Sequence, residues 1–225
     1  MAVLLNEARA IIENQISRTI TGVTTGPYTE KKADVAIKTI LHEVNFRAKV
    51  LRSKGTFNTV ADQATANFTT ADTTFEQRRL LSLRIGLLSG TALYDTFTHK
   101  HLGYVTRLLE QNTGTGQPEF IGFEANSAAL LHPIPDAVYR ITYVWNEPET
   151  DFALGAAGDG VTFSMPEDVI YPALSLGGAA MFQTLDDARR NTTGTLWFQY
   201  RQWLEQLVGE YSDMGEDFAG PDGAW

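Results

Sequence analysis

The chain has 225 residues, contains no cysteine and carries a formal charge of −9 at pH 7. The lack of cysteine excludes disulfide scaffolds and thiolate chemistry, and the negative charge opposes binding to phosphate backbones, which depends on lysine and arginine. No segment approaches the ~20 apolar residues of a membrane span, and the N-terminus lacks the basic start of a signal peptide. We therefore expect a protein made in the cytosol, with no membrane partner.

Residues 1–54 predict two helices that belong to a small bundle. Residues 3–18 are amphipathic, and residues 30–52 carry a longer apolar stripe that begins after Thr29, a capping residue. The members of the longer stripe recur at helical spacing: Ala33, Ile37, Ile40, Leu41, Val44, Ala48 and Leu51.

The second of these helices has apolar residues on a second side as well. Val35, Phe46 and Val50 fall roughly opposite the main stripe, because each residue turns a helix by about 100°. Two apolar faces need two partners. The second partner is either another part of the same chain or a neighbouring subunit, for which these three residues are the candidate contacts.

Residues 55–163 predict an inserted antiparallel β domain. Residues 55–74 favour a loop-rich hairpin, residues 79–89 alternate as a strand with one buried face, and residues 91–111 fit strand and helix equally. Further strands are expected at 119–123 and 128–132. The second of these leads into a hairpin over 130–145 that turns at Pro135-Asp136.

Residues 164–211 predict the C-terminal helices of the bundle. Ser164 and Glu167 match a capping box, Pro172 predicts a kink or a late start, and Gly177-Gly178 would let another helix approach closely. The final helix should pack on the first two through residues at helical spacing: Trp197, Tyr200, Leu204, Leu207, Val208 and Tyr211.

Residues 212–225 are acidic and glycine-rich, yet they contain Phe218 and Trp225. Such a segment cannot fold alone. It is either a solvated tail or an extended arm whose aromatic residues anchor on another subunit and become ordered on contact. The predicted fold class is thus α+β: a helical bundle from both ends of the chain, an inserted antiparallel β domain and a C-terminal arm.

The residues that could take part in catalysis or metal binding are scattered along the chain. His99 and His101 would share one face of a strand and could bind a metal with a carboxylate, but exposed loop histidines are the more common case. Adjacent carboxylates such as Glu167-Asp168 fit helix starts and turns better than acid–base catalysis. We predict no catalytic residue, no metal and no cofactor, and expect Arg189-Arg190 to dock an acidic partner surface.

The order of elements resembles the head-to-tail adaptor (connector) proteins of tailed bacteriophages. The resemblance covers roughly residues 28–211. It is carried by two helices, the segment HPIPDAVYRITYVWNEP, the segment FSMPEDVIYPALSLGGAAMF and a closing aromatic helix. The positions that match the family's pattern are Pro133, Pro135, Asp136, Ala137, Tyr143, Trp145, Pro148 and Pro166-Glu167.

This resemblance implies a structural virion protein made in the host cytoplasm and located in the neck, between the capsid portal and the tail. It would form a homo-oligomeric ring, typically a dodecamer, bind the portal above and a tail, stopper or nozzle protein below, and line the DNA exit channel without binding DNA specifically. The C-terminal arm would reach the portal through Tyr211, Met214, Phe218 and Trp225.

Two other functions remain open from the sequence. A different neck or tail-tube component would share the structural role. A glycan-binding or glycan-hydrolysing tail module would need a pair of carboxylates facing a substrate on the β domain.

Overall fold

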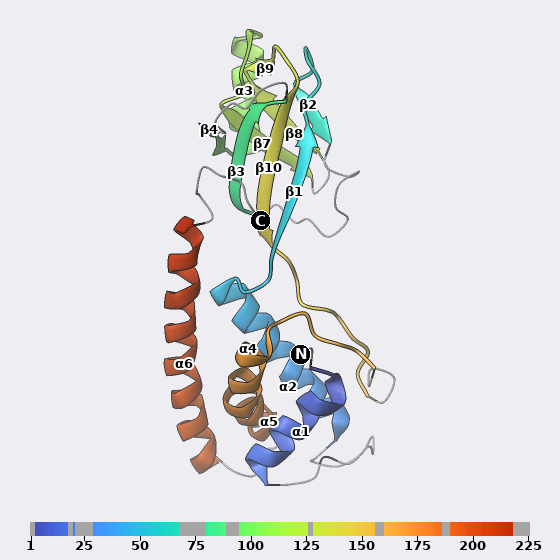
Figure 1. Ribbon diagram of the computed structural model, residues 1–225, viewed down its shortest axis with the longest axis vertical. Helices are drawn as coiled ribbons and strands as arrows, with labels where there is room; N and C mark the ends of the chain where they lie inside the picture. The colour runs from blue at the N-terminus through green and yellow to red at the C-terminus, as the bar shows by residue number, and fades with distance from the viewer. Residues whose placement is uncertain are drawn as a thin grey trace. The chain divides into compact units, whose positions relative to one another are not determined.

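A computed structural model describes residues 3–17, 20, 29–67, 80–88, 95–125, 128–155, 160–185 and 190–217. The chain is α+β, as predicted, and divides into two compact units. A helical unit extends to Leu51 and resumes at Pro148, and a β unit comprises Arg52–Glu147 (Figure 1). The predicted boundary at 54/55 lies close to the observed one. The predicted boundary at 163/164 is wrong, because the β unit ends at Glu147 and Phe152 and Phe163 belong to the core of the helical unit.

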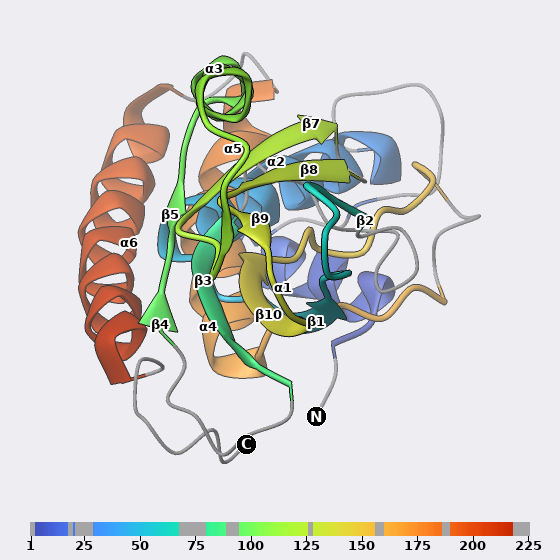
Figure 2. The same cartoon turned by 90° about the horizontal axis from the view of Figure 1, so that it is seen from above.

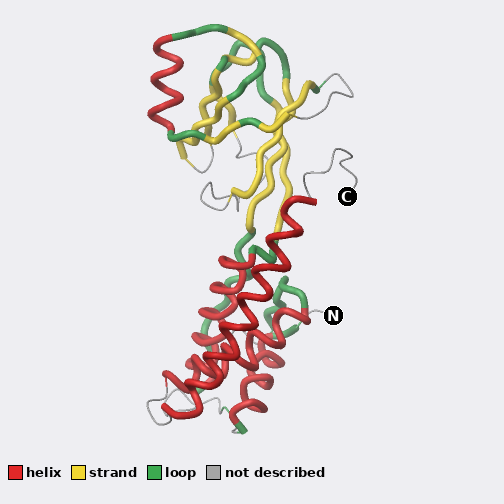
Figure 3. The backbone as a smooth tube through the Cα atoms, turned by 90° about the vertical axis from the view of Figure 1, so that its left-hand side faces the viewer, coloured by secondary structure: helices red, strands yellow, loops and turns green. Residues whose placement is uncertain are grey.

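The helical unit contains the great majority of the described helical residues, and the β unit contributes one helix to them (Figure 3). In chain order its elements are α1 (Leu5–Ile16), α2 (Glu30–Ala48), α4 (Glu167–Pro172), a π-helical segment η3 (Ala173–Gly178), α5 (Ala179–Leu185) and α6 (Arg190–Asp217). Helices from both ends of the chain share one apolar core, and α2 packs against α6, η3 and α5.

The start and stripe of α2 agree with the sequence prediction. The Thr29 side chain accepts a hydrogen bond from the Lys32 amide at 3.3 Å and caps the helix. The stripe from Ala33 to Ala48 is buried, whereas the helix ends at Ala48 and the chain enters a strand at Arg52.

The predicted capping box at Ser164 is wrong. α4 begins after Pro166, which makes no side-chain cap. The carboxylate of Glu149 instead accepts hydrogen bonds from the amides of Ser164, at 2.8 Å, and Met165, at 2.9 Å. Pro166 has no side-chain acceptor to cap the helix, and a carboxylate from an earlier part of the chain binds the two amides before it.

The break predicted at Pro172 takes the form of a change in helix type. α4 ends at Pro172 and the chain continues as the π-helical segment before α5 begins. The predicted close approach at the glycine pair is confirmed. A Cβ atom on Gly177 would lie 2.6 Å from the Tyr200 ring, and one on Gly178 would lie 3.1 Å from Ile12 Cδ1.

The helix α6 is longer than the sequence predicts. Tyr200, Leu204 and Leu207 are buried as expected, but the helix continues to Asp217, so the predicted extended arm is wrong for residues 212–217. Helix propagation adds one hydrogen bond per residue and does not require an apolar stripe, and the next proline is Pro221. Residues 218–225 lie outside the described part of the chain.

The β unit consists of two facing sheets and one helix (Figure 2). The first sheet has the order β1 (Arg52–Asn58), β10 (Tyr139–Asn146), β3 (Leu80–Leu87) and β4 (Asp95–Thr96). The second has the order β2 (Thr65–Asn67), β8 (Ala128–His132), β7 (Phe120–Ala125) and β5 (Thr98–His99), and a short pair joins β6 (Thr115–Gly116) to β9 (Ile134–Pro135).

The apolar core of the β unit lies between the two sheets. Ile85, Ile141 and Tyr143 enter it from the first sheet, and Ile121 and Leu131 enter it from the second. The helix α3 (Leu102–Gln111) covers the other side of the second sheet, where its buried Val105 is so close to Gly122 that a Cβ atom there would lie 3.0 Å from Val105 Cγ2.

The predicted hairpin over 130–145 is wrong. Its two strands, β8 and β10, lie in different sheets: β8 pairs with β7 and β2, whereas β10 pairs with β1 and β3. Alternating side chains reveal a strand but not its neighbour, and Pro133 and Pro135 lack the amides that a tight hairpin would use.

Two further predictions about the β unit need correction. Residues 55–74 do not form a hairpin in their described part, because β1 pairs with β10 and β2 pairs with β8. The domain is not purely antiparallel, because β5 pairs with β7 and β6 with β9 in parallel. The ambiguous residues 91–111 contain β4, β5 and α3 in their described part.

Candidate interfaces for self-assembly and partner binding

The described histidines do not form a metal centre. No group of three or more metal-binding side chains occurs in the described parts of the chain. The His99 ring meets Phe123 edge-on with 5.0 Å between ring centroids, and burial lowers the pKa of His99. His101 caps α3, because its Nδ1 accepts a hydrogen bond from the Gly103 amide at 3.2 Å. These two histidines thus have structural roles in the β unit.

The outer side of α2 carries a stripe that we call the α2 stripe: Val35, Thr39, His42 and Phe46. These residues are spaced by three or four positions and lie on one side of the helix. Phe46 is 64% exposed, and its ring stacks on His42 with 6.4 Å between centroids. Val35 is half-buried. An exposed phenylalanine of this kind is typical of a protein–protein contact.

Val50 does not belong to this stripe, although the sequence predicted it as an interface residue. It follows the last turn of α2 and packs against the core of the helical unit. The prediction failed because it extended the helical spacing beyond Ala48, where the helix ends.

Basic residues flank the α2 stripe, and two of them lie beside a carboxylate. Lys31, Lys38 and Arg47 are exposed on the same helix. Lys38 forms an ion pair with Asp151, and its hydrogen bond lowers the pKa of that carboxyl. Arg47 lies 3.9 Å from Glu43.

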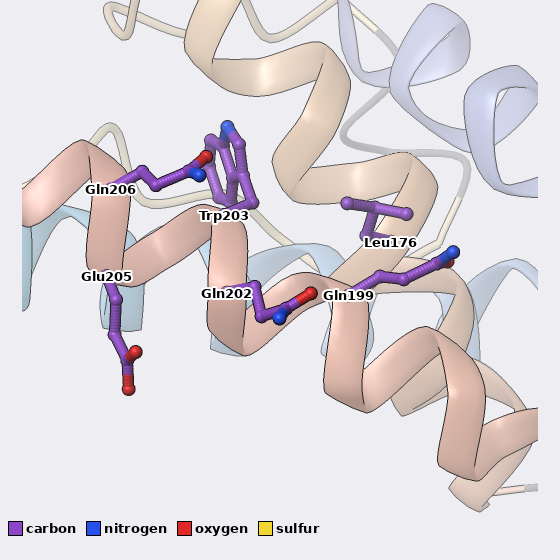
Figure 4. Close-up of a pocket in the computed structure, with 6 residues that line it drawn as sticks. All are labelled: Leu176, Gln199, Gln202, Trp203, Glu205 and Gln206. Atoms are coloured by element: carbon purple, nitrogen blue, oxygen red, sulfur yellow. The ribbon is translucent and has the colours of Figure 1, made fainter.

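The outer side of α6 carries a second exposed aromatic residue and a row of amides. Phe198 is 62% exposed. Gln199, Gln202, Trp203 and Gln206 line a hollow between α6 and Leu176 of η3, and Glu205 lies at its rim (Figure 4). The close-up shows Trp203 and Gln206 side by side, Gln199 next to Leu176, and Glu205 pointing away from them. We call Phe198 together with these α6 residues the α6 face.

Buried polar contacts hold α1, α2 and α6 in fixed positions. Arg9 Nε donates to Asp34 Oδ1 at 2.7 Å, and Arg9 Nη2 donates to Asp34 Oδ2 at 2.9 Å. The Gly155 amide also donates to Asp34 Oδ2 at 2.6 Å and fastens the loop after Pro148. The Tyr200 hydroxyl donates to Glu43 at 3.2 Å, and burial followed by the charge of Glu43 raises the pKa of Tyr200.

The outward side of the first sheet is basic, which the sequence analysis missed. Lys54 and Arg140 are exposed, and Arg52 and Arg84 are half-buried on the same side. Their neighbours there are Thr56, Asn58, Ser82 and Thr142, and none of the described outward-facing residues of β1, β10 and β3 is acidic. The polar positions of each alternating strand carry these basic residues. They form one surface only when β1, β10 and β3 lie side by side, and the sequence does not show this strand order.

An apolar patch lies at one end of this sheet. It comprises Val60 after β1, Leu88 after β3 and Val138 before β10, each between 39% and 50% exposed. The backbone brings them together, because the Leu88 amide donates to the Val138 carbonyl at 3.2 Å and the Thr59 amide donates to the Tyr139 carbonyl at 2.8 Å. Contiguous apolar surface of this kind marks contact sites.

The remaining predicted site residues lie near or beyond the end of the description. Tyr211 is half-buried and packs on the core of the helical unit, so it is not part of a free arm. Arg190 begins α6 and Met214 lies in its last turns, but their side chains are not described. Arg189, Phe218 and Trp225 lie outside the described residues.

Comparisons with known proteins leave the family open. No known family matches the sequence, and no curated protein matches it. Among the described residues, no helix is both long enough and apolar enough to cross a membrane.

Proposed function

We propose that this chain is a head-to-tail adaptor of a tailed bacteriophage, a structural virion protein without catalytic activity. Copies of it would form a homo-oligomeric ring in the neck. This ring would join the portal above to a tail, stopper or nozzle protein below. DNA would pass through the channel without specific binding, since most of the chain's charge is negative.

The observation that carries this proposal is the pair of exposed phenylalanines on opposite ends of the sequence. Phe46 and Phe198 are the two most exposed of the described large apolar side chains, and they lie on α2 and α6, which pack against each other in the helical unit. A ring needs two different surfaces on each subunit, one for each neighbour. The α2 stripe and the α6 face provide two such surfaces.

Charge supports the pairing of these two surfaces across a ring contact. The α2 stripe is flanked by the exposed Lys31 and by Lys38, which also pairs with Asp151, whereas α6 exposes Glu205 and Glu210 together with the basic Arg201 along this side. Opposite charges around an apolar centre set the orientation and the rate of association more than its strength. Phe46 and Phe198 would supply most of the binding free energy.

Light scattering on the purified chain, alone and mixed with the portal protein of the same phage, tests the proposal. The wild-type chain should form a ring, or should do so when the portal is present. Phe46→Asp and Phe198→Asp should each abolish the assembly without unfolding the subunit, because both side chains are exposed. Gln111→Asp, at an exposed position of α3 outside both surfaces, is the control and should still assemble.

A second candidate, the glycan-binding or glycan-hydrolysing tail module, is favoured by one observation. A hollow at the start of α4 is lined by Glu167, Asp168 and Tyr171, and Tyr171 is 54% exposed. Aromatic rings and carboxylates are groups that a sugar site uses. Glu167 and Asp168 are adjacent in sequence, however, and both complement the positive end of α4. Release of reducing sugar from host glycans that is lost in Glu167→Gln would favour this module over the adaptor.

A further inference from the structure

The basic side of the first sheet is unexpected in a chain with a charge of −9. Lys54, Arg84 and Arg140 lie on three adjacent strands of one sheet. The strand register pairs Arg140 with Asn58 and Gly86, and Arg84 with Thr142 in the next outward row. The exposed Lys54 and Arg140 make this side of the sheet one that an anionic occupant would complement.

The same chain contains a segment of opposite charge. After Arg201 the sequence has no lysine or arginine, and it has six carboxylates, at Glu205, Glu210, Asp213, Glu216, Asp217 and Asp222. The last part of this segment also has two aromatic residues, Phe218 and Trp225. Acidic groups followed by a terminal tryptophan complement a basic surface that ends in an apolar patch.

We propose that the C-terminal segment, residues 217–225, of one copy binds the outward side of the β1–β10–β3 sheet of a second copy. Trp225 would contact the apolar patch of Val60, Leu88 and Val138, and the carboxylates of Asp222 and Asp217 would face the basic side chains. This inference rests on the proposed function in one respect, because it requires copies of the chain to be neighbours in an assembly.

The spacing of the two partners agrees. An extended chain rises about 3.3 Å per residue, so Asp222 and Asp217 would follow Trp225 at about 10 Å and about 26 Å. On the sheet, Arg140 lies two residues from Val138 and Arg84 pairs two residues further along β10, at about 7 Å and about 13 Å. Lys54 pairs with Val144, at about 20 Å, and Arg52 with Asn146, at about 26 Å.

The surface is less suited to nucleic acid. The outward residues of the three strands include no aromatic side chain on which a base could stack. The rest of the chain is acidic and would repel a phosphate backbone.

Disulfide trapping tests the inference, because the chain has no cysteine of its own. Full-length Ala224→Cys is mixed with full-length, size-tagged Val138→Cys and oxidised. A mixed dimer should form efficiently, since a disulfide needs Cα atoms about 4.4–6.8 Å apart. Glu110→Cys, an exposed position on α3 of the same unit, replaces Val138→Cys as the position control and should give little product. Equal product from both partners would overturn the inference.

Charge reversal makes the test specific. Lys54→Glu with Arg140→Glu should lower the yield of mixed dimer about three- to tenfold, and Asp217→Lys with Asp222→Lys on the other partner should restore it. Lys49→Glu with Arg107→Glu changes the net charge equally at exposed positions outside both proposed contacts and should leave the yield unchanged. A failure of the second pair of substitutions to restore the yield would contradict the proposed contact.

Three other outcomes would also overturn the inference. If the double variant Ala224→Cys/Val138→Cys closes only within one chain, the segment binds its own copy. If trapping occurs only to the portal, the arm serves that partner. If Lys54→Glu with Arg140→Glu abolishes retention of a double-stranded DNA fragment but not trapping, the surface binds nucleic acid. A ring that binds the portal but shows no trapping would contradict this inference and leave the proposed function intact. Trapping without any portal binding would support this inference and contradict the proposed function.

Discussion

Removal of the Asp34 carboxylate should strongly destabilise the helical unit. Asp34 is fully buried, and Arg9 is 6% exposed. Asp34→Ala would remove two charge-assisted hydrogen bonds from Arg9 and the 2.6 Å hydrogen bond from the Gly155 amide, and would leave the Arg9 charge buried. Breaking a buried pair on one side costs roughly 3–5 kcal/mol, a large part of the ~5–15 kcal/mol that stabilises a typical domain.

Urea unfolding followed by circular dichroism in the helix band measures this effect. The signal reports mainly the helical unit, because α3 is the one described helix outside it. Asp34→Asn keeps an acceptor for Gly155 and should cost less than Asp34→Ala. The double variant Arg9→Met/Asp34→Leu should recover most of the loss, because it removes both charges. A loss below about 1 kcal/mol in Asp34→Ala would refute the reasoning that the buried Arg9 charge depends on this carboxylate.

Two further predictions concern packing and pH. Gly177→Ala should destabilise the helical unit by about 1–3 kcal/mol, because its Cβ would lie 2.6 Å from the Tyr200 ring, whereas Gly209→Ala meets nothing within 4 Å and should be neutral or stabilising in the same urea experiment. Burial, and then the 2.6 Å hydrogen bond to Asp136, raises the pKa of Tyr139 to about 12. The raised value means that the neutral phenol is favoured in the folded state, so its contribution to stability is complete below pH ~10 and is lost as the pH rises towards 12. Tyr139→Phe should be less stable than wild type near pH 7 by about 0.5–1.5 kcal/mol, and this difference should shrink above pH ~10; a constant difference up to pH 12 would contradict the pKa shift.

The helical unit was largely predictable from the sequence. Its helices depend on local signals: the cap at Thr29, the buried stripe of α2 and the aromatic spacing of α6 all follow from residues a few positions apart. The close contact at Gly177 followed from the absence of a side chain. The start of α4 could not be predicted from local residues, because the amides before it bind Glu149, which is distant in sequence.

The β unit was predictable strand by strand but not in its pairing. The alternation in β3, β8 and β10 was evident, yet nothing local indicates that β10 lies between β1 and β3. This error also concealed the basic surface, since Lys54 and Arg140 become neighbours only when β1 and β10 pair. The sequence did not reveal Phe198 as an exposed residue, because the helical spacing of α6 identifies its buried side and not the apolar residues opposite it.

The central claim is that copies of this chain associate through the α2 stripe and the α6 face and then bind a portal. The most direct measurement is a cryo-electron microscopy reconstruction of the purified chain mixed with that portal. The account predicts a closed ring on the portal, with Phe46 of each subunit against the α6 face of its neighbour. A monomer that stays separate from the portal, or a ring in which Phe46 and Phe198 both face solvent, would contradict it.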